Sequence, residues 1–249
     1  MKTEWDYTTL ADAYLKRPDY APDAIDAVFR MSGARAGERA CDVGAGVAHL
    51  TLQLAQRGLR VDAVEPNDAM RANGIKRTSS FPNVAWHEGT GEATGRDGGQ
   101  YRLVTFGSSF NVTDRPKALK EVKRLLALGG WFVCMWNHRD LSDPLQAKIE
   151  AAIKNRIPSY GYGSRREDQT AVIEASGLFG PVKNVEGSVI HRQSAQDCLE
   201  AWRSHATLER QAKGHFHAVI ADIEKILADL KGAAVQIPYT TRVWLAPVK

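Results

Sequence analysis

The sequence lacks the cysteine pattern of a disulfide-stapled or metal-binding protein. Its 3 cysteines among 249 residues, Cys41, Cys134 and Cys198, are odd in number and far apart. They form neither a disulfide framework nor the CxxC pairs of metal and redox sites. His215 and His217 have no carboxylate beside them, so we expect no metal site there either. A chain of this length buries enough apolar surface to fold without such cross-links.

Long hydrophobic runs and a strong excess of one charge are also missing. The longest apolar run, residues 131–136, has six residues, whereas a membrane span needs about 18 or more. The first ten residues contain two acids and no apolar segment, so we expect no signal peptide. Lys and Arg number 33 against 29 Asp and Glu, and the basic residues are scattered in short pairs. This pattern disfavours a nucleic-acid partner. We expect a soluble cytoplasmic protein, monomeric or homodimeric, with no membrane partner.

Short β-branched runs alternate with amphipathic segments over the first 137 residues, which is typical of an α/β fold with a parallel sheet. The pattern predicts helices at 11–15, 23–31, 49–57, 67–75 and 116–128, the last ended by Gly129 and Gly130. It predicts strands at 40–43, 60–64, 84–87, 101–106 and 131–136.

The pattern changes after residue 137. Predicted helices at 143–156, 165–176, 194–211 and 216–231 surround one strand at 182–191, and a last strand follows at 240–245. We therefore predict a Rossmann-like, doubly wound sheet that is mostly parallel, with an antiparallel edge strand and a helical cap. Within this single domain we assign residues 1–137 to N-terminal helices and a cofactor-binding core. We assign residues 138–235 to the cap helices and a late strand, and residues 236–249 to the terminal strand.

The most specific motif lies between Asp42 and Glu65. Gly44 and Gly46 follow a predicted strand and precede a helix, so they permit a tight turn and a close approach of a ligand to the backbone. Glu65 ends the next strand, 19 residues after Gly46, where a carboxylate can accept hydrogen bonds from both hydroxyls of a ribose. The sequence therefore predicts a nucleoside site.

Two features argue against a dinucleotide. His49 occupies the third glycine position of GxGxxG, where it would crowd the approach of helix to strand. Asp42 precedes the glycines and would repel a diphosphate, but an anion suits an ammonium group. We expect a cationic, phosphate-free adenosine ligand.

The glycine motif belongs to a longer pattern made of the stretches CDVGAGVAHLTLQLAQRG, VDAVEPNDAM and EGTGEATG. This pattern resembles the class I S-adenosylmethionine-dependent methyltransferases, and the branch that acts on small molecules matches best. The resemblance covers roughly residues 10–136 and the terminal strand pair, and YLKRPDY at 14–20 resembles the segment before the first strand in that branch. It implies an enzyme of secondary metabolism that transfers a methyl group from S-adenosylmethionine to a small molecule.

The resemblance also implies roles for particular residues. Asp42 and the glycines would hold the methionine moiety, with Arg17 or Tyr14 near its carboxylate, and Glu65 would take the ribose hydroxyls. Further residues would pack on or border the adenine or form the loop after the fourth strand. The implied cofactor residues are Tyr14, Arg17, Asp42, Gly44, Gly46, Glu65, Pro66, Met70, Thr90, Gly91, Glu92, Gly107, Ser108 and Ser109.

The sequence departs from the family pattern at two places. The fourth strand usually opens with an aspartate, but Tyr101 and Arg102 stand there. The loop GSSFN at 107–111 replaces a more usual aromatic loop that contains histidine. Both departures bear on the substrate rather than on the cofactor.

Candidate substrate and catalytic residues lie near the N-terminus, in the loop after the fourth strand, at the end of the fifth strand and in the Gly-rich stretch 160–168. Residues 136–140 leave that strand at the carboxyl edge of the sheet, where ligands bind in open α/β folds. Residues 160–168 form either a lid with glycine hinges or an exposed loop. Predicted substrate contacts are Phe110, Asn111, Trp136, Arg139, Tyr160 and Tyr162, and candidate catalytic residues are Tyr7, Asn137 and His138.

Other functions share the same motifs. The cofactor's own amino group could attack its γ-carbon, which would form azetidine-2-carboxylate and release methylthioadenosine without a separate acceptor pocket. A third hypothesis is a non-catalytic protein that binds S-adenosylmethionine. Nucleic-acid methylation would predict an NPPY-like tetrapeptide after the fourth strand, but residues 108–111 read SSFN.

Overall fold

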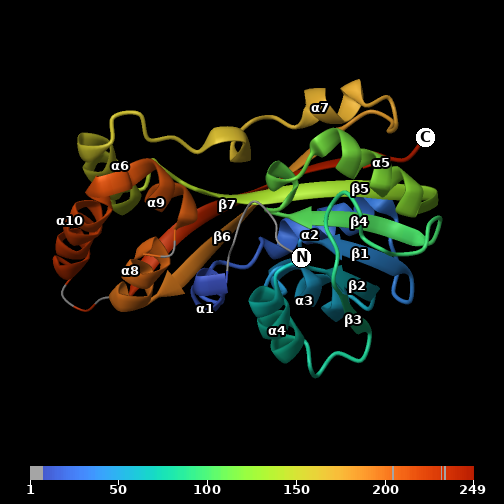
Figure 1. The fold of residues 1–249 in the computed structure, drawn as a ribbon, viewed down its shortest axis with the longest axis horizontal. Coiled ribbons are helices and arrows are strands. Elements are labelled where there is room, and N and C mark those ends of the chain that lie inside the picture. Colours follow the sequence, from blue (N-terminus) through green and yellow to red (C-terminus); the bar gives the residue numbers. More distant parts are fainter. Residues whose placement is uncertain (1–7, 204, 231, 233) are drawn as a thin grey trace.

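A computed structural model describes residues 8–203, 205–230, 232 and 234–249 (Figure 1). The strands are β1 (Arg39–Val43), β2 (Arg60–Val64), β3 (Val84–His87), β4 (Tyr101–Gly107), β5 (Leu126–Arg139), β6 (Lys183–Gln193) and β7 (Val235–Pro247). The α-helices are α1 (Ala11–Tyr14), α2 (Pro22–Ser32), α3 (His49–Gln56), α4 (Asp68–Arg77), α5 (Arg115–Leu125), α6 (Pro144–Arg156), α7 (Thr170–Ala175), α8 (Ala195–Arg203), α9 (Ala206–Ala212) and α10 (Phe216–Ala228). Short 3-10 helices are η1 (Thr8–Leu10), η2 (Phe110–Val112), η3 (Gly163–Arg165) and η4 (Lys213–His215).

The strands form one seven-stranded sheet in the order β3-β2-β1-β4-β5-β7-β6. Strands β1 to β5 pair in parallel, and β7 runs antiparallel between β5 and β6. The predicted Rossmann-like, mostly parallel sheet is confirmed, with the antiparallel strand second from the edge. From β1 the chain continues to β2 and β3 on one side, and it then crosses to β4 on the other side of β1. At this reversal of strand order a crevice opens at the carboxyl end of β1.

Helices cover both faces of the parallel sheet, which explains why its central strands β1 and β4 are almost entirely buried. On one face α2 and α3 pack through Ile25, Val28 and Leu54 against the sheet. On the other face α5 and α7 pack through residues such as Leu119 and Ile173. The sheet core is therefore built from nearly continuous hydrophobic strands between two helical layers.

The end of α5 differs from the prediction. The helix stops at Leu125, and Leu126 already pairs with Tyr101 as the first residue of β5. Gly129 has a φ of +75°, and a Cβ on Gly130 would lie 2.8 Å from the carbonyl oxygen of Tyr101. The two glycines therefore permit an irregular stretch within a long strand, and they do not cap a helix.

Two further predicted helices are shorter in the structure. The 194–211 segment divides into α8 and α9, because His205 caps α9 by accepting a hydrogen bond from the backbone N–H of Leu208 at 3.2 Å. In the 165–176 segment, α7 begins only at Thr170, whose backbone N–H donates to Asp168 at 2.7 Å.

The cap comprises α6, α8, α9 and α10 together with the ends of β6 and β7 that they cover (Figure 1, yellow to red). Its core includes Ile149, Trp202, Val219 and Ile237. Helix α7 also belongs to the segment predicted as cap, but it packs on the sheet core. The boundary at residue 138 remains a proposal.

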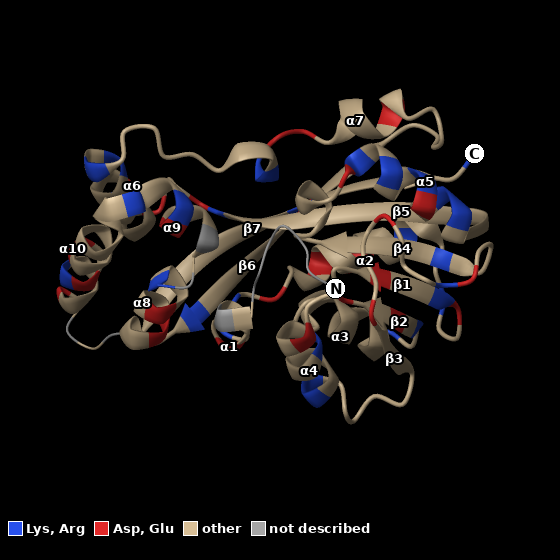
Figure 2. Cartoon of the chain, in the orientation of Figure 1, with Lys and Arg blue, Asp and Glu red and all other residues tan. Residues whose placement is uncertain are grey.

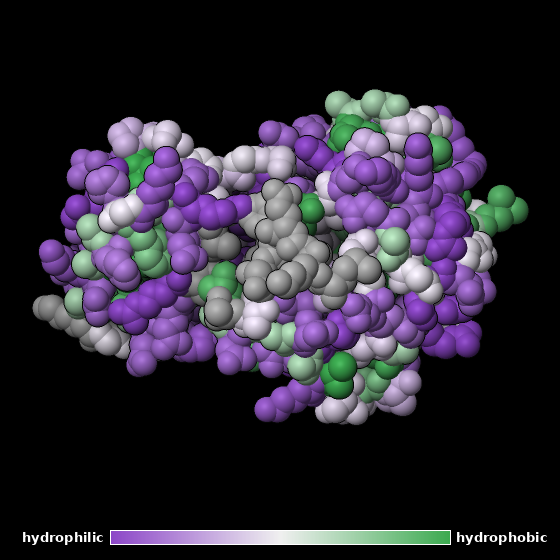
Figure 3. All heavy atoms as spheres, in the orientation of Figure 1, coloured by the Kyte–Doolittle hydropathy of each residue, from purple (hydrophilic) through white to green (hydrophobic). Residues whose placement is uncertain are grey.

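Basic and acidic positions are interspersed along the helices at both ends of the molecule in the view of Figure 2. The same face is mostly hydrophilic, with hydrophobic areas that are small and separate (Figure 3). In the described part of the chain, every helix is too short or too polar to cross a bilayer.

Candidate functional site

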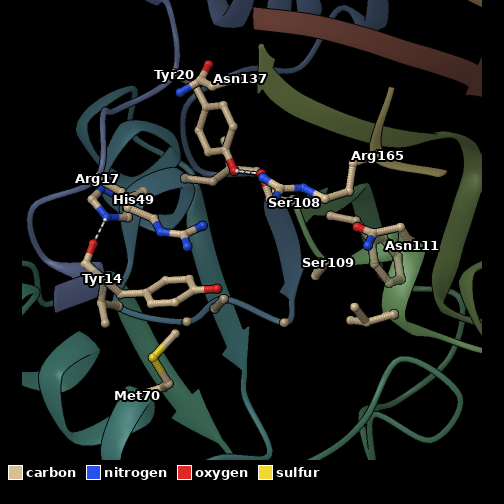
Figure 4. Close-up of a pocket in the computed structure, with 18 of the residues that line it drawn as sticks. Tyr14, Arg17, Tyr20, His49, Met70, Ser108, Ser109, Asn111, Asn137 and Arg165 are labelled. Carbon is tan, nitrogen blue, oxygen red and sulfur yellow. Dashed lines mark hydrogen bonds between the residues drawn. The ribbon is translucent and has the colours of Figure 1, made fainter. Parts of the chain in front are cut away.

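A cavity of about 940 Å³ opens at the carboxyl ends of β1, β2, β4 and β5 and continues toward the cap. Its walls come from the glycine loop after β1, the segment before α2, the ends of the strands, and parts of η3, β6, α8, α9 and β7. Figure 4 shows part of this wall. The volume is at the upper end of the range of about 300–1,000 Å³ that is usual for small-molecule sites.

The glycine loop needs its glycines for two reasons. Gly44 and Gly46 have φ values of +66° and +57°, which L-residues rarely adopt. A Cβ on Gly44 would lie 2.5 Å from Cβ of Ser109, and one on Gly46 would lie 3.3 Å from the methyl group of Met70. The loop therefore passes so close to its neighbours that a side chain at either glycine would displace Ser109 or Met70 on the cavity wall.

Glu65 is buried at the end of β2 and is held by two backbone groups. The N–H of Gly46 donates to Oε2 and the N–H of Asn67 donates to Oε1, each at 2.9 Å. Burial raises the pKa of this carboxyl, although both hydrogen bonds act in the opposite direction. The carboxylate thus joins the glycine loop to the start of α4, and each oxygen keeps a lone pair for a further donor.

Asp42 is fully buried beneath the loop and lines the cavity. It accepts hydrogen bonds from the hydroxyls of Thr51 at 2.6 Å and Thr105 at 2.8 Å. Burial raises its pKa to about 6. The hydroxyls of α3 and β4 lower the pKa of Asp42 and so favour its ionised form, against the effect of burial.

The segment before α2 is anchored over the cavity by His49. One ring nitrogen lies 2.7 Å from the carboxylate of Asp19, and the other lies 2.8 Å from the carbonyl oxygen of Tyr14 (Figure 4). The guanidinium of Arg17 stacks over the Tyr14 ring at 3.8 Å. His49 was predicted to crowd the contact of helix and strand, but its ring points away from it and fixes this segment.

The loop after β4 contacts Tyr20, a cavity residue from the segment before α2 that was not among the predicted site residues. Ser108 has a φ of +61°, and its hydroxyl lies 2.9 Å from the hydroxyl of Tyr20 (Figure 4). Ser109 donates from its hydroxyl to the carbonyl oxygen of Val43 at 2.6 Å. Burial raises the pKa of Tyr20, so its hydroxyl stays protonated at neutral pH.

The remaining predicted cofactor residues also line the cavity. Pro66 and Met70 follow Glu65, and residues 90–92 border the same region. A Cβ on Gly91 would lie 2.5 Å from a methyl carbon of Thr113, and Glu92 accepts a hydrogen bond from the Asp114 backbone at 2.7 Å. The structure thus brings all predicted cofactor residues to one cavity.

Two candidate catalytic residues line the cavity, and the third, Tyr7, lies outside the described residues. The side-chain amide of Asn137 donates to the carbonyl oxygens of Pro18 and Asp19, and its oxygen accepts from the Thr241 hydroxyl at 2.5 Å. This hydrogen bonding ties the segment before α2 to β5 and β7.

His138 is buried, and its Nε2 lies 2.9 Å from the carbonyl oxygen of Arg165. Because a carbonyl only accepts hydrogen bonds, Nε2 carries the proton. Burial lowers the pKa of His138 to about 4, so the ring is neutral at pH 7 and Nδ1 keeps its lone pair.

Three predicted substrate residues do not lie on the described cavity wall. Phe110 and Trp136 are fully buried, and Tyr160 is buried in the cap core. Trp136 donates from its indole N–H to Asn111 at 3.0 Å and packs edge-on against Trp244. The structure therefore places them away from the cavity wall, and their contact with a substrate stays a prediction.

The other predicted substrate residues, Asn111, Arg139 and Tyr162, do line the cavity. Cavity residues that were not predicted as site residues include Lys16, Tyr20, His49, Arg165, Arg166, His191, His205, Arg210 and Tyr239. Tyr20 lies in a motif already noted, and the two neighbouring arginines lie in the stretch considered as a lid. Lys16 and His49 also lie in stretches already noted, whereas His191, His205, Arg210 and Tyr239 come from distant segments and carry no local signal.

Within the described ranges, His, Cys, Asp and Glu side chains form no group of three that could hold a metal ion.

Comparison with known proteins shows what this part of the chain is similar to. Residues 40–130 match the family model described as a methyltransferase domain. An uncharacterized methyltransferase of Mycobacterium tuberculosis is 34% identical over 128 residues, which cover 50% of this chain and 48% of that protein. The ubiquinone/menaquinone biosynthesis C-methyltransferase of Zymomonas mobilis is 30% identical over 151 residues, covering 55% of this chain and 62% of that protein. The chain therefore spans about half the length of the first of these relatives.

A solved structure shares the fold. Phosphoethanolamine N-methyltransferase 2 of Haemonchus contortus, in complex with phosphomonomethylethanolamine and S-adenosylhomocysteine, superposes with a TM-score of 0.52 at 14% identity. The match covers 91% of this chain and 52% of that one. Residues 40–130 therefore match a methyltransferase domain by sequence, and the chain shares its fold with this N-methyltransferase.

Proposed function

We propose that the protein transfers the methyl group of S-adenosylmethionine to a small-molecule acceptor. The observation that carries the proposal is the extent of the cavity. It reaches from the glycine loop past Ser108 to residues of the cap such as His205 and Tyr239, with a volume of about 940 Å³. A cavity of this size leaves room for an acceptor beside a nucleoside cofactor. The relative from Zymomonas, whose name describes a C-methyltransferase of quinone biosynthesis, supports a small acceptor.

The residues around the glycine loop fit this cofactor. We propose that Glu65 accepts hydrogen bonds from the ribose hydroxyls through the lone pairs left free by Gly46 and Asn67. The adenine would lie against Pro66 and Met70, beside residues 90–92. The close approach of Gly44 to Ser109 leaves a bare backbone surface for the ligand.

The methionine end of the cofactor would lie between an anion and a cation. Asp42 would attract the ammonium group, since its carboxylate is anchored at the floor of the cavity. Arg17, stacked on Tyr14 at the rim, would attract the carboxylate. This arrangement complements the zwitterionic amino-acid end of the cofactor, and its ammonium group is the one that the sequence analysis placed beside Asp42.

When bound, S-adenosylmethionine supplies an electrophilic methyl group on a sulfonium. The protein's residues would contribute mainly by alignment of donor and acceptor, an effect that can be worth about 7–11 kcal/mol. Ser108 and Tyr20 hold each other at the end of β4 and face the middle of the cavity (Figure 4). Their oxygens would fix the geometry at which the acceptor approaches.

His138 is the described candidate for contact with the acceptor's reacting atom. It is neutral and oriented by the carbonyl oxygen of Arg165, so Nδ1 can accept a hydrogen bond from a hydroxyl or amine. A pKa of about 4 makes it a weak proton acceptor, so we assign it the role of orienting the acceptor. Asn137 would act through the segment before α2, which it ties to the sheet, and is a positioning residue.

The test separates transfer from cyclisation. Purified protein is incubated with S-adenosylmethionine, alone and with pools of small molecules, and the products are followed by mass spectrometry. The proposal expects S-adenosylhomocysteine to form only when an acceptor is present. Methylthioadenosine formed without an acceptor would overturn it in favour of the cyclase. Failure of S-adenosylhomocysteine to bind, measured by calorimetry, would exclude both enzymes.

A further inference from the structure

The charged residues that line the cavity are sorted by sign. The acids belong to the core, where they surround the glycine loop and the loops after β3 and β4; they are Asp42, Glu65, Glu92 and Asp114. The basic residues lie on the segment before α2 and toward the cap; they are Lys16, Arg17, Arg139, Arg165, Arg166 and Arg210. Arg17 is proposed to bind the cofactor's carboxylate, and the other arginines make the cap end of the cavity positive.

Arg139, at the end of β5, carries a charge that the described protein does not neutralise. Its Nε donates to the hydroxyl of Tyr239 at 2.9 Å, and its guanidinium stacks on Trp202, 3.8 Å from the ring centroid. In the described ranges no carboxylate pairs with it. A guanidinium has five N–H donors in a planar fork, so the four on the terminal nitrogens keep their capacity for a ligand.

The nearby carboxylates of the cap are already engaged by other groups. Glu150 accepts from the hydroxyl of Tyr162 at 2.5 Å and pairs with Lys154 at 3.1 Å. Asp197 pairs with Lys16 at 2.8 Å. A partly buried charge is normally paired, because removal from water is costly. Arg139 departs from this rule, and it does so on a cavity wall.

Neighbouring arginines strengthen the positive potential. Arg166 donates to the carbonyl oxygen of Arg139 at 2.9 Å and stacks over Tyr162 at 4.2 Å. Arg165 extends toward the Tyr20–Ser108 pair from the opposite side of the pocket to Arg17 (Figure 4). The pKa of His205 lies well below its usual value, first because of burial and then because of Arg139, Arg165 and Arg17. Arg139 and Arg165 thus both add positive potential near His205 at the cap end of the cavity.

We propose that the methyl acceptor carries an oxyanion, a carboxylate or a phosphate, which Arg139 binds through both terminal nitrogens. The inference rests on the proposed function and names the substrate class of that site. Planar, bidentate binding of such groups is what the arginine fork favours. With its anion on Arg139, the acceptor would point its other end toward Ser108 and the cofactor.

The experiment measures oxyanion binding by calorimetry, with and without saturating S-adenosylhomocysteine. The probes are succinate and inorganic pyrophosphate, which separate a carboxylate from a phosphate preference, and succinamide is the neutral counterpart of succinate. Millimolar sodium chloride at equal ionic strength is the blank. We expect saturable binding of at least one oxyanion probe and no binding of succinamide.

Variants locate the site. Arg139→Met keeps much of the apolar stem over Trp202 and removes the charge, so it should weaken oxyanion binding at least tenfold. Arg139→Lys keeps the charge but loses the fork, and a smaller loss is expected. Arg192→Met is the matched control, because Arg192 is exposed on β6 between the cavity-lining residues His191 and Gln193. It should change oxyanion affinity less than twofold.

The outcomes separate this inference from the proposed function. Equal binding of succinamide and succinate, or no oxyanion binding above the blank, overturns the inference while S-adenosylhomocysteine still binds. If Arg139→Met weakens S-adenosylhomocysteine as much as the probes, the anion bound is the cofactor's carboxylate and the inference is wrong. Should Arg139→Met fail to fold, Arg139→Lys and the probe comparison on the unaltered protein still decide. Oxyanion binding without S-adenosylhomocysteine binding would contradict the proposed function but support the oxyanion site.

Discussion

The two ends of the cavity are constructed differently. Around the glycine loop, the acids already have partners within the protein: Glu65 accepts two backbone N–H groups and Asp42 accepts two hydroxyls. At the cap end, Arg139 has one hydrogen bond and two aromatic neighbours, but no described counter-ion. The first end is organised by the fold before any ligand arrives. The second end has charge left over for a ligand.

The largest expected effect on cofactor binding comes from a side chain added to the glycine loop. Gly44→Ala places a Cβ 2.5 Å from Cβ of Ser109 at a positive φ, so we expect S-adenosylhomocysteine affinity to fall more than about 100-fold, by calorimetry. Gly95→Ala is the control. It also has a positive φ, +67°, but its Cβ would meet nothing within 4 Å. It should lower the free energy of unfolding by about 1–2 kcal/mol and leave binding unchanged; equal binding losses in both variants would contradict the assignment.

Removal of the proposed ribose acceptor should have the next largest effect. Glu65→Ala loses a buried charged acceptor, so affinity for S-adenosylhomocysteine should fall by about 10- to 100-fold, measured by calorimetry. The exposed carboxylate of Glu186, which pairs with Arg242 on β7, offers a control in Glu186→Ala. Unchanged affinity in Glu65→Ala, with the protein folded by circular dichroism, would show that the ribose lies elsewhere.

The free energy of unfolding should depend on pH through Asp42, the buried aspartate beneath the glycine loop. The folded pKa of Asp42 is about 6, above the usual 3.8, because of burial. The folded state therefore binds the proton more tightly than the unfolded state, and this stabilisation is present below about pH 4 and lost as pH rises through 6. The difference in free energy of unfolding between the wild type and Asp42→Asn should shift by up to about 3 kcal/mol across that range, followed by urea titration.

Cofactor binding should show the opposite trend. Since an ionised Asp42 would attract the ammonium group, S-adenosylhomocysteine affinity should rise several-fold between pH 5 and pH 7 in the wild type, and less in Asp42→Asn. Parallel pH profiles in both proteins would remove Asp42 from the methionine site.

The smallest effect on binding is expected at Trp136. This indole is fully buried, donates to Asn111 and packs on Trp244, away from the described wall. Trp136→Phe should lower the free energy of unfolding by about 1–3 kcal/mol and change ligand affinity less than twofold. A selective loss of acceptor binding at unchanged stability would restore Trp136 to the substrate site.

Much of the core was predictable because its signals are local. The parallel strands appear as short apolar runs, and the glycine loop, Asp42 and Glu65 lie within 24 residues of one another in the chain. Hydrogen bonds of the following strand and helix then bring them together. The exact helix ends were less accessible, since Leu126 follows the apolar spacing of α5 yet pairs with Tyr101 in the sheet.

The sequence by itself determined the alternation of strands and helices, the glycine loop and the acids that identify the cofactor fold. Only the tertiary structure decided which side chains meet at the cap end. Arg139 rests on Trp202 and bonds to Tyr239, 63 and 100 positions further along the chain, whereas Phe110 and Trp136 are withdrawn into the core. The physical reason is that strand periodicity sets which face a side chain takes locally, but only the long-range pairing of β5 with β7 and the packing of α8 set what that face meets.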